Sequence, residues 1–226
     1  MKNNMNVSET VLGWFYFLFH LVLLPYLMDW INSQLPDPLS KAWVCLLSYG
    51  VSALFIMMIC HNFLATAGSN MTKNASGWLR AVALGFCIYF TSDTLMDLFM
   101  SNFHPEFARV TDSTLATMTK LDFLPMAVGI IFLVPFVEEM LYRGLIFRTL
   151  FAQSKSLGYV AATIIYAFLH ISGYMDSYEP FGLFLCFLQF VPAGFTLAWT
   201  YANSDNILAP ITIHVIINTM GVAAMR

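Results

Sequence analysis

The sequence predicts an all-α protein, a polytopic bundle of six to eight transmembrane helices. Hydrophobic residues make up 59% of the chain and charged residues only 10%, whereas a soluble domain carries about 25% charged residues. A helix that spans a bilayer needs about 20 mainly apolar residues, and at least six stretches of this chain meet or approach that length. Composition and segment length therefore both indicate a membrane protein.

Seven apolar segments follow one another along the chain. The first begins after a polar tail and is not followed by a small-residue cleavage pattern, so we interpret it as a retained helix and not as a signal peptide. The second leads into a connection rich in Gly, Ser, Asn and Thr, residues 67–77, which predicts a break between helices. The expected spans are residues 11–30, 42–64, 78–100, 123–150, 158–172, 181–202 and 207–225.

The connections set the range of helix numbers. The longest polar connection, residues 101–122, is expected to contain a short interfacial helix. The fourth span is long for one crossing unless it tilts, breaks or ends at the interface, and Pro135 offers a kink within it. No low-complexity linker separates the segments, so a single membrane-embedded domain, residues 1–226, accounts for the chain.

Charge is sparse and scattered. A net charge of −3 without a basic patch argues against nucleic-acid binding. Basic residues near the span ends favour a cytoplasmic N-terminus by a small margin. On the side of the N-terminus these residues are Lys73, Arg80, Arg148 and Lys155, and on the other side they are Lys41, Arg109 and Lys120.

Cys45, Cys60, Cys87 and Cys186 all lie within apolar segments and show no close pairing. We interpret them as core or lipid-facing residues, because a disulfide framework or a thiolate zinc site needs closer spacing.

A charged island interrupts the fourth apolar segment, with the sequence Glu138-Glu139-Met-Leu-Tyr-Arg143. Ionisable residues inside membrane spans are functional candidates by default. On a helix, Glu139 and Arg143 share a face and can neutralise each other. Glu138 points about 100° away, so it is the candidate catalytic carboxylate. The alternative is an ion network at a helix end exposed to headgroups and water.

Two later segments carry a histidine with a partner one helical turn away. Tyr166 precedes His170 by four residues and should stack on the same face, and His214 has the same spacing to Asn218. Taken alone, His170 reads as a structural histidine, and the second pair reads as interhelical hydrogen bonding. If three helices converge, Glu138, both histidines and Asn218 could meet in one pocket.

A carboxylate and imidazoles around a water molecule form a hydrolytic site. Glu138 would act as general base toward water attacking a peptide carbonyl, and His214 and Asn218 could donate hydrogen bonds to the oxyanion. His170 could orient the water or protonate the leaving amine. Zinc held by Glu138, His170 and His214 is the other way to activate water, but the chain lacks an H-E-x-x-H helix. We therefore favour direct activation without a cofactor.

In their order along the chain, these three motifs resemble those of the CPBP family, which comprises CAAX prenyl protease-like and bacteriocin-processing (Abi) membrane proteins. The resemblance covers residues 135–218 and is carried by Glu138, Glu139, Arg143, Tyr166, His170, His214 and Asn218. Tyr166 stands where a phenylalanine is more frequent.

The resemblance implies the helical fold of the Ras-converting CAAX endopeptidase and a membrane-embedded endopeptidase activity. It implies that Glu138 activates water, that both histidines assist it, and that Asn218 faces the oxyanion. Glu139 and Arg143 would hold the helix end, and the substrate would be a peptide or membrane protein. The compact chain resembles bacterial relatives, which are linked to peptide processing and bacteriocin immunity, so a multi-pass protein of the bacterial cytoplasmic membrane is expected.

Two alternatives belong to other functional classes. A non-catalytic bacteriocin-immunity or scaffolding protein could retain the pocket and act by binding. An ion-coupled transporter could use Asp93 and Asp97, which are spaced i, i+4 in the third span. We favour helix capping for these two aspartates, because no inverted repeat is visible. His20 and His61 have no spaced partner and receive no role.

Overall fold

The computed structural model describes residues 4–107 and 122–224, and all regular structure in these ranges is helical. The α-helices are α1 (Val7–Leu18), α2 (Leu24–Ser33), α3 (Lys41–Ile59), α4 (His61–Lys73), α5 (Ala75–Phe103), α7 (Phe123–Val128), α8 (Val134–Glu138), α9 (Arg148–Gln153), α10 (Lys155–Ile171), α11 (Pro180–Ser204) and α12 (Leu208–Ala224). Three π-helical segments join some of them into longer rods, at Phe19–Leu23, Gly129–Leu133 and Glu139–Phe147. Two short 3-10 turns are Pro105–Phe107 and Ser172–Tyr174.

Six of the described helical rods are long and apolar enough to cross a membrane, and α12 is a shorter apolar helix. The predicted helical membrane bundle is confirmed. Large apolar side chains on the outside of the bundle are exposed, as a lipid-facing surface requires. They include Phe15, Leu54, Leu79, Phe90, Phe168 and Phe181.

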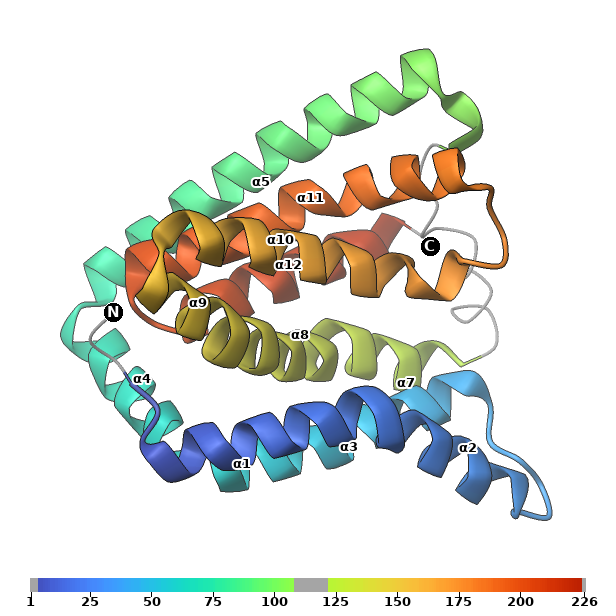
Figure 1. The fold of residues 1–226 in the computed structure, drawn as a ribbon, viewed down its shortest axis with the longest axis horizontal. Helices are drawn as coiled ribbons and strands as arrows, with labels where there is room; N and C mark the ends of the chain where they lie inside the picture. Colours follow the sequence, from blue (N-terminus) through green and yellow to red (C-terminus); the bar gives the residue numbers. More distant parts are fainter. Residues whose placement is uncertain (1–3, 108–121, 225–226) are drawn as a thin grey trace.

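The helices run back and forth between two ends of the bundle (Figure 1). One end holds the N-terminus, α4 and the α9–α10 turn, and we call it the N-terminal end. The other holds the α2–α3 turn, the last turns of α5 and α10, and the C-terminus, and we call it the C-terminal end. The two termini therefore lie at opposite ends of the molecule.

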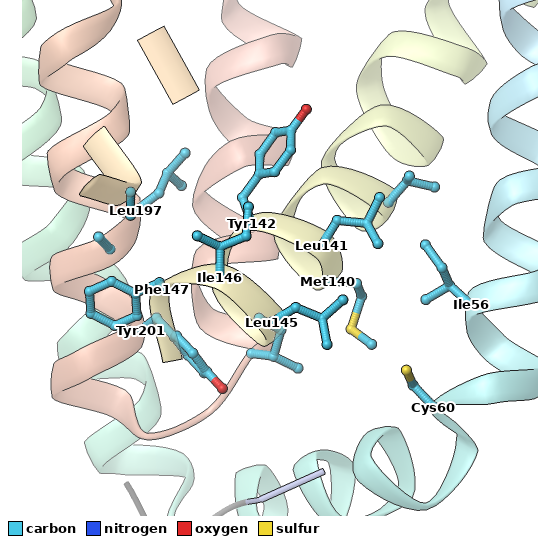
Figure 2. Close-up of a cluster of buried hydrophobic side chains, with 14 of the residues drawn as sticks. Ile56, Cys60, Met140, Leu141, Tyr142, Leu145, Ile146, Phe147, Leu197 and Tyr201 are labelled. Atoms are coloured by element: carbon cyan, nitrogen blue, oxygen red, sulfur yellow. The ribbon is translucent and has the colours of Figure 1, made fainter. Parts of the chain in front are cut away.

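The rod formed by α7, α8 and α9, residues Phe123–Gln153, is the centre of the bundle. Of the most apolar 18-residue stretch of this rod, 56% of the residues are buried inside the protein, whereas the corresponding share is 22% in each of the first two rods. Figure 2 shows side chains from Met140 to Phe147 reaching Leu197 and Tyr201 on one side and Ile56 and Cys60 on the other. The charged island is thus built into the best-packed helix.

Two of the π-helical segments end two positions before a proline. The Leu24 N–H bonds the Phe19 carbonyl five residues back, next to Pro25, and the Val134 N–H bonds Gly129 in the same way, next to Pro135. Proline has no N–H and its ring crowds the carbonyl four residues before it, so a wider turn relieves the conflict. The kink expected at Pro135 takes the form of a π turn.

The expected break at residues 67–77 is wrong in extent. The second span ends at Ile59, and α4 continues through most of the polar stretch to Lys73. Contacts from distant segments stabilise α4. Glu9 accepts a hydrogen bond from the Phe63 N–H at 2.9 Å, and the Asn206 amide donates to the Ala67 carbonyl at 2.8 Å.

The predicted connection at residues 101–122 lies largely outside the described residues. Its described part contains the end of α5 and the turn Pro105–Phe107.

Candidate active site

Glu138 and Glu139 lie where α8 passes into the π-helical segment Glu139–Phe147. Glu138 is 6% exposed, and Glu139 and Arg143 are fully buried. The alternative of an ion network exposed to headgroups and water is therefore wrong, whereas the supporting role of Glu139 and Arg143 stays a prediction. A wide turn of this kind often marks a functional site.

Glu139 is the anchor of the buried polar network. Its Oε1 accepts hydrogen bonds from Arg143 Nη1 at 2.9 Å and from His214 Nδ1 at 2.8 Å. The predicted i, i+4 ion pair is present, and it also fixes the histidine of α12. Because a carboxylate oxygen can only accept, the His214 hydrogen is on Nδ1 and Nε2 faces away from Glu139.

Arg143 ties the central rod to α10 and α11. Its Nη2 donates to the Gly194 carbonyl at 3.1 Å, and its guanidinium lies 4.6 Å from the centre of the Tyr166 ring. Gly194 lets α11 pack closely on α10, since a Cβ there would come within 3.3 Å of the Thr163 backbone. The guanidinium is thus held by an anion, a carbonyl dipole and a ring face.

His170 is positioned by the residue one turn before it, as predicted. The Tyr166 and His170 rings stack with centroids 4.0 Å apart, and His170 Nδ1 lies 2.9 Å from the Tyr166 carbonyl oxygen. The carbonyl requires a donor, so Nδ1 carries the hydrogen here as well. Phe190 of α11 closes the other side of the ring at 4.9 Å.

The two imidazoles and Glu138 meet at one point. Glu138 Oε2 lies 3.8 Å from His170 Nε2 and 4.0 Å from His214 Nε2. Among the described residues this buried oxygen has no hydrogen-bond partner. Both distances are longer than a direct hydrogen bond.

Asn218 lies on the same side of α12 as His214 but contacts a different element. Its amide donates to the Ile130 carbonyl at 2.7 Å, within the π-helical segment Gly129–Leu133. One amide hydrogen and the amide oxygen are not engaged by this bond. The oxyanion role of Asn218 stays a prediction.

A cavity of about 310 Å³ opens beside Glu138 and His170, and Tyr142 contributes to its wall. Two further residues line it: His20 of the first rod, to which the sequence gave no role, and Tyr49 of α3, which the sequence did not single out. The Tyr49 hydroxyl is a hydrogen-bonding neighbour of Glu138. His20 carried a signal in the sequence, an ionisable residue inside an apolar span five positions before a proline, whereas nothing local marked Tyr49.

The side chains around Glu138 can also be compared with those of a zinc site. Within residues 4–107 and 122–224, no three His, Cys, Asp or Glu side chains meet the geometry of a metal site. The chemistry of Glu138, His170 and His214 is nevertheless that of zinc ligands, since both histidines donate Nδ1–H to an oxygen and direct Nε2 inward. Zinc remains the alternative proposal.

The other residues weighed in the sequence lie away from this centre. Asp93 belongs to α5, and Tyr89 one turn earlier is its hydrogen-bonding neighbour. The four cysteines are free thiols, with Cys60 and Cys186 buried and Cys87 exposed.

Fold and site together define a polytopic helical membrane protein with a buried glutamate–histidine centre. A family model described as "Rce1-like: Type II CAAX prenyl endopeptidase Rce1-like" matches residues 120–220. This segment contains every residue on which the resemblance to the CPBP, CAAX protease-like family rests, and that resemblance is confirmed. No curated protein and no solved structure matches the chain. The family supports a CAAX-type membrane endopeptidase in general.

Proposed function

We propose that this protein is an endopeptidase embedded in the bacterial cytoplasmic membrane, in which Glu138 activates water to hydrolyse peptide bonds of membrane-associated or secreted-peptide substrates. The observation that carries the proposal is Oε2 of buried Glu138, which accepts no hydrogen bond from residues 4–107 and 122–224 and lies 3.8 and 4.0 Å from the Nε2 atoms of His170 and His214. A water molecule between these atoms would lie beside the cavity and in contact with Glu138, the proposed general base.

The proposed site works with one proton beyond the two Nδ1–H groups. Arg143 compensates the charge of Glu139 through their 2.9 Å ion pair, so the carboxylate of Glu138 has no cation of its own in this pairing. An isolated buried charge is costly, and one added proton shared by Glu138 and the two histidines would neutralise the cluster. With that proton on His214 Nε2, the site has a carboxylate base and an imidazolium donor at the same time.

In the proposed reaction, Glu138 takes a proton from water as the water oxygen attacks the carbonyl carbon of the substrate. The carbonyl oxygen becomes an oxyanion, toward which His214 Nε2–H and the second amide hydrogen of Asn218 can donate. When the C–N bond breaks, the amine leaves with a proton that passes from Glu138 by way of His170. The products are a carboxylic acid and an amine, and the side chains of the site return to their initial protonation.

The metal alternative uses the same three residues. Glu138, His170 and His214 would hold zinc, which would supply a bound water that ionises near neutral pH. Glu139 and the Tyr166 carbonyl would keep the two imidazoles oriented by accepting their Nδ1–H groups. We favour the mechanism without metal, and a chelator separates the two.

The test is cleavage of a membrane-peptide library by the purified protein in liposomes. We expect Glu138→Gln and Glu138→Ala to lower the rate roughly 100-fold or more, the contribution of a positioned general base, without unfolding the bundle. Glu179→Gln is the matched control, because Glu179 is an exposed carboxylate at the start of α11. Activity lost on chelation and restored by zinc would replace the proposed mechanism with the metal one.

An inactive but folded wild-type protein would support the alternative of a non-catalytic bacteriocin-immunity or scaffolding protein. In that case Glu138→Gln should leave the cellular phenotype intact.

A further inference from the structure

A second cavity, of about 490 Å³, lies next to the catalytic one, between α2 and α3. The two cavities have His20, Pro25 and Tyr49 in common. The shared wall makes the two cavities neighbours, with Glu138 lining the first and the α2–α3 turn beside the second. The second compartment has the size of small-molecule and peptide pockets, about 300–1,000 Å³.

The second cavity changes character along its length. Leu24, Met28 and Val44 give it an apolar lining, whereas Asp29 and Lys41 line it with charges of both signs near the α2–α3 turn. A lipid would match these charges only with its headgroup and leaves the polar side chains Asn32 and Ser48 of the same lining facing hydrocarbon. An extended polypeptide offers apolar side chains together with polar backbone and ionised groups, so it fits the whole lining better.

His20 stands at the junction of the two compartments in a fixed orientation. Its Nδ1 lies 3.0 Å from Ser52 Oγ, and that hydroxyl donates to the Ser48 carbonyl at 2.8 Å. Because the hydroxyl hydrogen is already used, Nδ1–H is the donor to Ser52 and Nε2 is left as an acceptor. The Tyr49 ring packs edge-on against His20 at 5.6 Å. At the junction, His20 Nε2 is therefore a hydrogen-bond acceptor whose ring orientation is fixed by Ser52.

We propose that the second cavity is the substrate-binding groove, which receives the polypeptide on one side of the scissile bond. Apolar substrate side chains lie against Leu24, Met28 and Val44, and His20 Nε2 accepts a hydrogen bond from a substrate backbone N–H as the chain enters the catalytic compartment. The inference rests on the proposed peptidase function. It assigns selectivity to residues 20–49, which lie outside the segment that the family model matches.

The first test fills the groove. Val44→Trp places an indole in the cavity, and we expect KM for a peptide with apolar residues beside the cut to rise roughly tenfold or more, with a smaller change in kcat, as in other hydrophobic specificity pockets. Leu47→Trp is the matched control, since Leu47 is on the same helix, is 44% exposed and lines neither cavity. His20→Leu should also raise KM more than it lowers kcat. Unchanged KM in both variants would overturn the proposal.

The second test measures binding and does not depend on cleavage. Cys45 lines the groove, so a fluorophore on Cys45 reports its occupant. The protein carries Glu138→Gln and has Cys60, Cys87 and Cys186 replaced by alanine. We expect saturable quenching by the apolar peptide, weakened by Val44→Trp. Quenching by added phospholipid but not by peptide would make the cavity a lipid pocket and overturn the proposal.

The two tests separate the failure of each proposal. A wild-type protein that cleaves peptides while the Cys45 reporter and the KM of Val44→Trp stay unchanged refutes the groove and leaves the peptidase. A wild-type protein that cleaves nothing refutes the peptidase, and the Cys45 reporter then still decides whether peptides enter the groove.

Discussion

Arg143 is a fully buried guanidinium whose partners come from three helical rods. Glu139, the Gly194 carbonyl and the Tyr166 ring surround it. Arg143→Leu would leave Glu139 as a buried carboxylate facing only His214. Removing one partner of a buried ion pair costs about 3–5 kcal/mol, so we expect the free energy of unfolding in mixed micelles to fall by that amount.

The control for Arg143 is Arg80→Leu, because Arg80 is exposed near the start of α5. Surface substitutions usually change stability by no more than about 0.5 kcal/mol. Adding Glu139→Gln to Arg143→Leu should recover part of the loss, because it removes the stranded charge. Equal stability of the Arg143 and Arg80 variants would show that the buried pair does not stabilise the bundle.

At the level of single residues, the sequence predicted the partners that are close along the chain. The pairs Glu139–Arg143 and Tyr166–His170 follow from helical spacing, and both are present. The bond from His214 to Glu139 spans 75 residues, and the position of His20 opposite Glu138 depends on how the rods pack. No local pattern encodes such distances, so the sequence predicted a shared pocket only on the condition that three helices converge, and an exposed charged island remained the alternative.

At the level of elements, Gly158 sets how closely α9 and α10 cross. A Cβ at this position would lie 2.8 Å from the Phe151 Cα, and a backbone atom cannot move aside as a flexible side chain can. We expect Gly158→Ala to destabilise the protein by roughly 1–3 kcal/mol, the usual cost of overpacking. The midpoint of thermal unfolding in detergent measures it.

Gly68→Ala provides the opposite case within the same protein. Gly68 lies in α4, and an added Cβ there meets nothing within 4 Å. Alanine is favoured over glycine in a helix by about 1 kcal/mol, so this substitution should raise the unfolding midpoint. If both glycine variants shifted the midpoint in the same direction, the close crossing at Gly158 would not be the cause.

Helix α4 shows why amino-acid composition gave a wrong prediction of where a helix is interrupted. Residues 67–77 contain glycine, serine and asparagine, which usually punctuate helices. Here the first turn of α4 is capped by a carboxylate 54 residues away, and the Ala67 carbonyl is bound by an amide 139 residues away. Tertiary hydrogen bonds overrode local propensity. Positions of the membrane spans were predicted more reliably, because they depend on hydrophobicity alone.

At the level of the whole molecule, the proposed chemistry and the proposed substrate contact fall in two different parts of the chain. Residues 120–220 match the family model and hold the glutamates, both histidines and Asn218. The first rod and α3 supply His20, Tyr49 and most of the second cavity. Such a division allows selectivity to change while the catalytic centre stays the same.

The same architecture makes a prediction about orientation. Six long rods and α12 cross between the two ends of the bundle (Figure 1). The 17 residues of α12 extend about 26 Å at 1.5 Å per residue, close to the hydrocarbon thickness of about 30 Å. Lys73 ends α4, Arg148 begins α9 and Lys155 begins α10. The α4 helix and the α9–α10 turn lie at the N-terminal end (Figure 1), whereas Lys41 begins α3 after the α2–α3 turn at the other end. The sequence adds Arg80 on the N-terminal side and Arg109 and Lys120 on the other, the last two outside the described residues. By that small margin the positive-inside rule predicts a cytoplasmic N-terminal end, and we expect the groove to open on the opposite face.

Single cysteines in a background without the four native ones test this orientation. Thr72→Cys lies in α4 at the N-terminal end, and Asp37→Cys lies in the exposed turn between α2 and α3. In intact cells, a membrane-impermeant maleimide should label position 37 and reach position 72 only after permeabilisation. The reversed result would invert the orientation and keep the fold. Labelling of both positions from outside would contradict the crossing pattern itself, because the two sites would then share one face of the membrane.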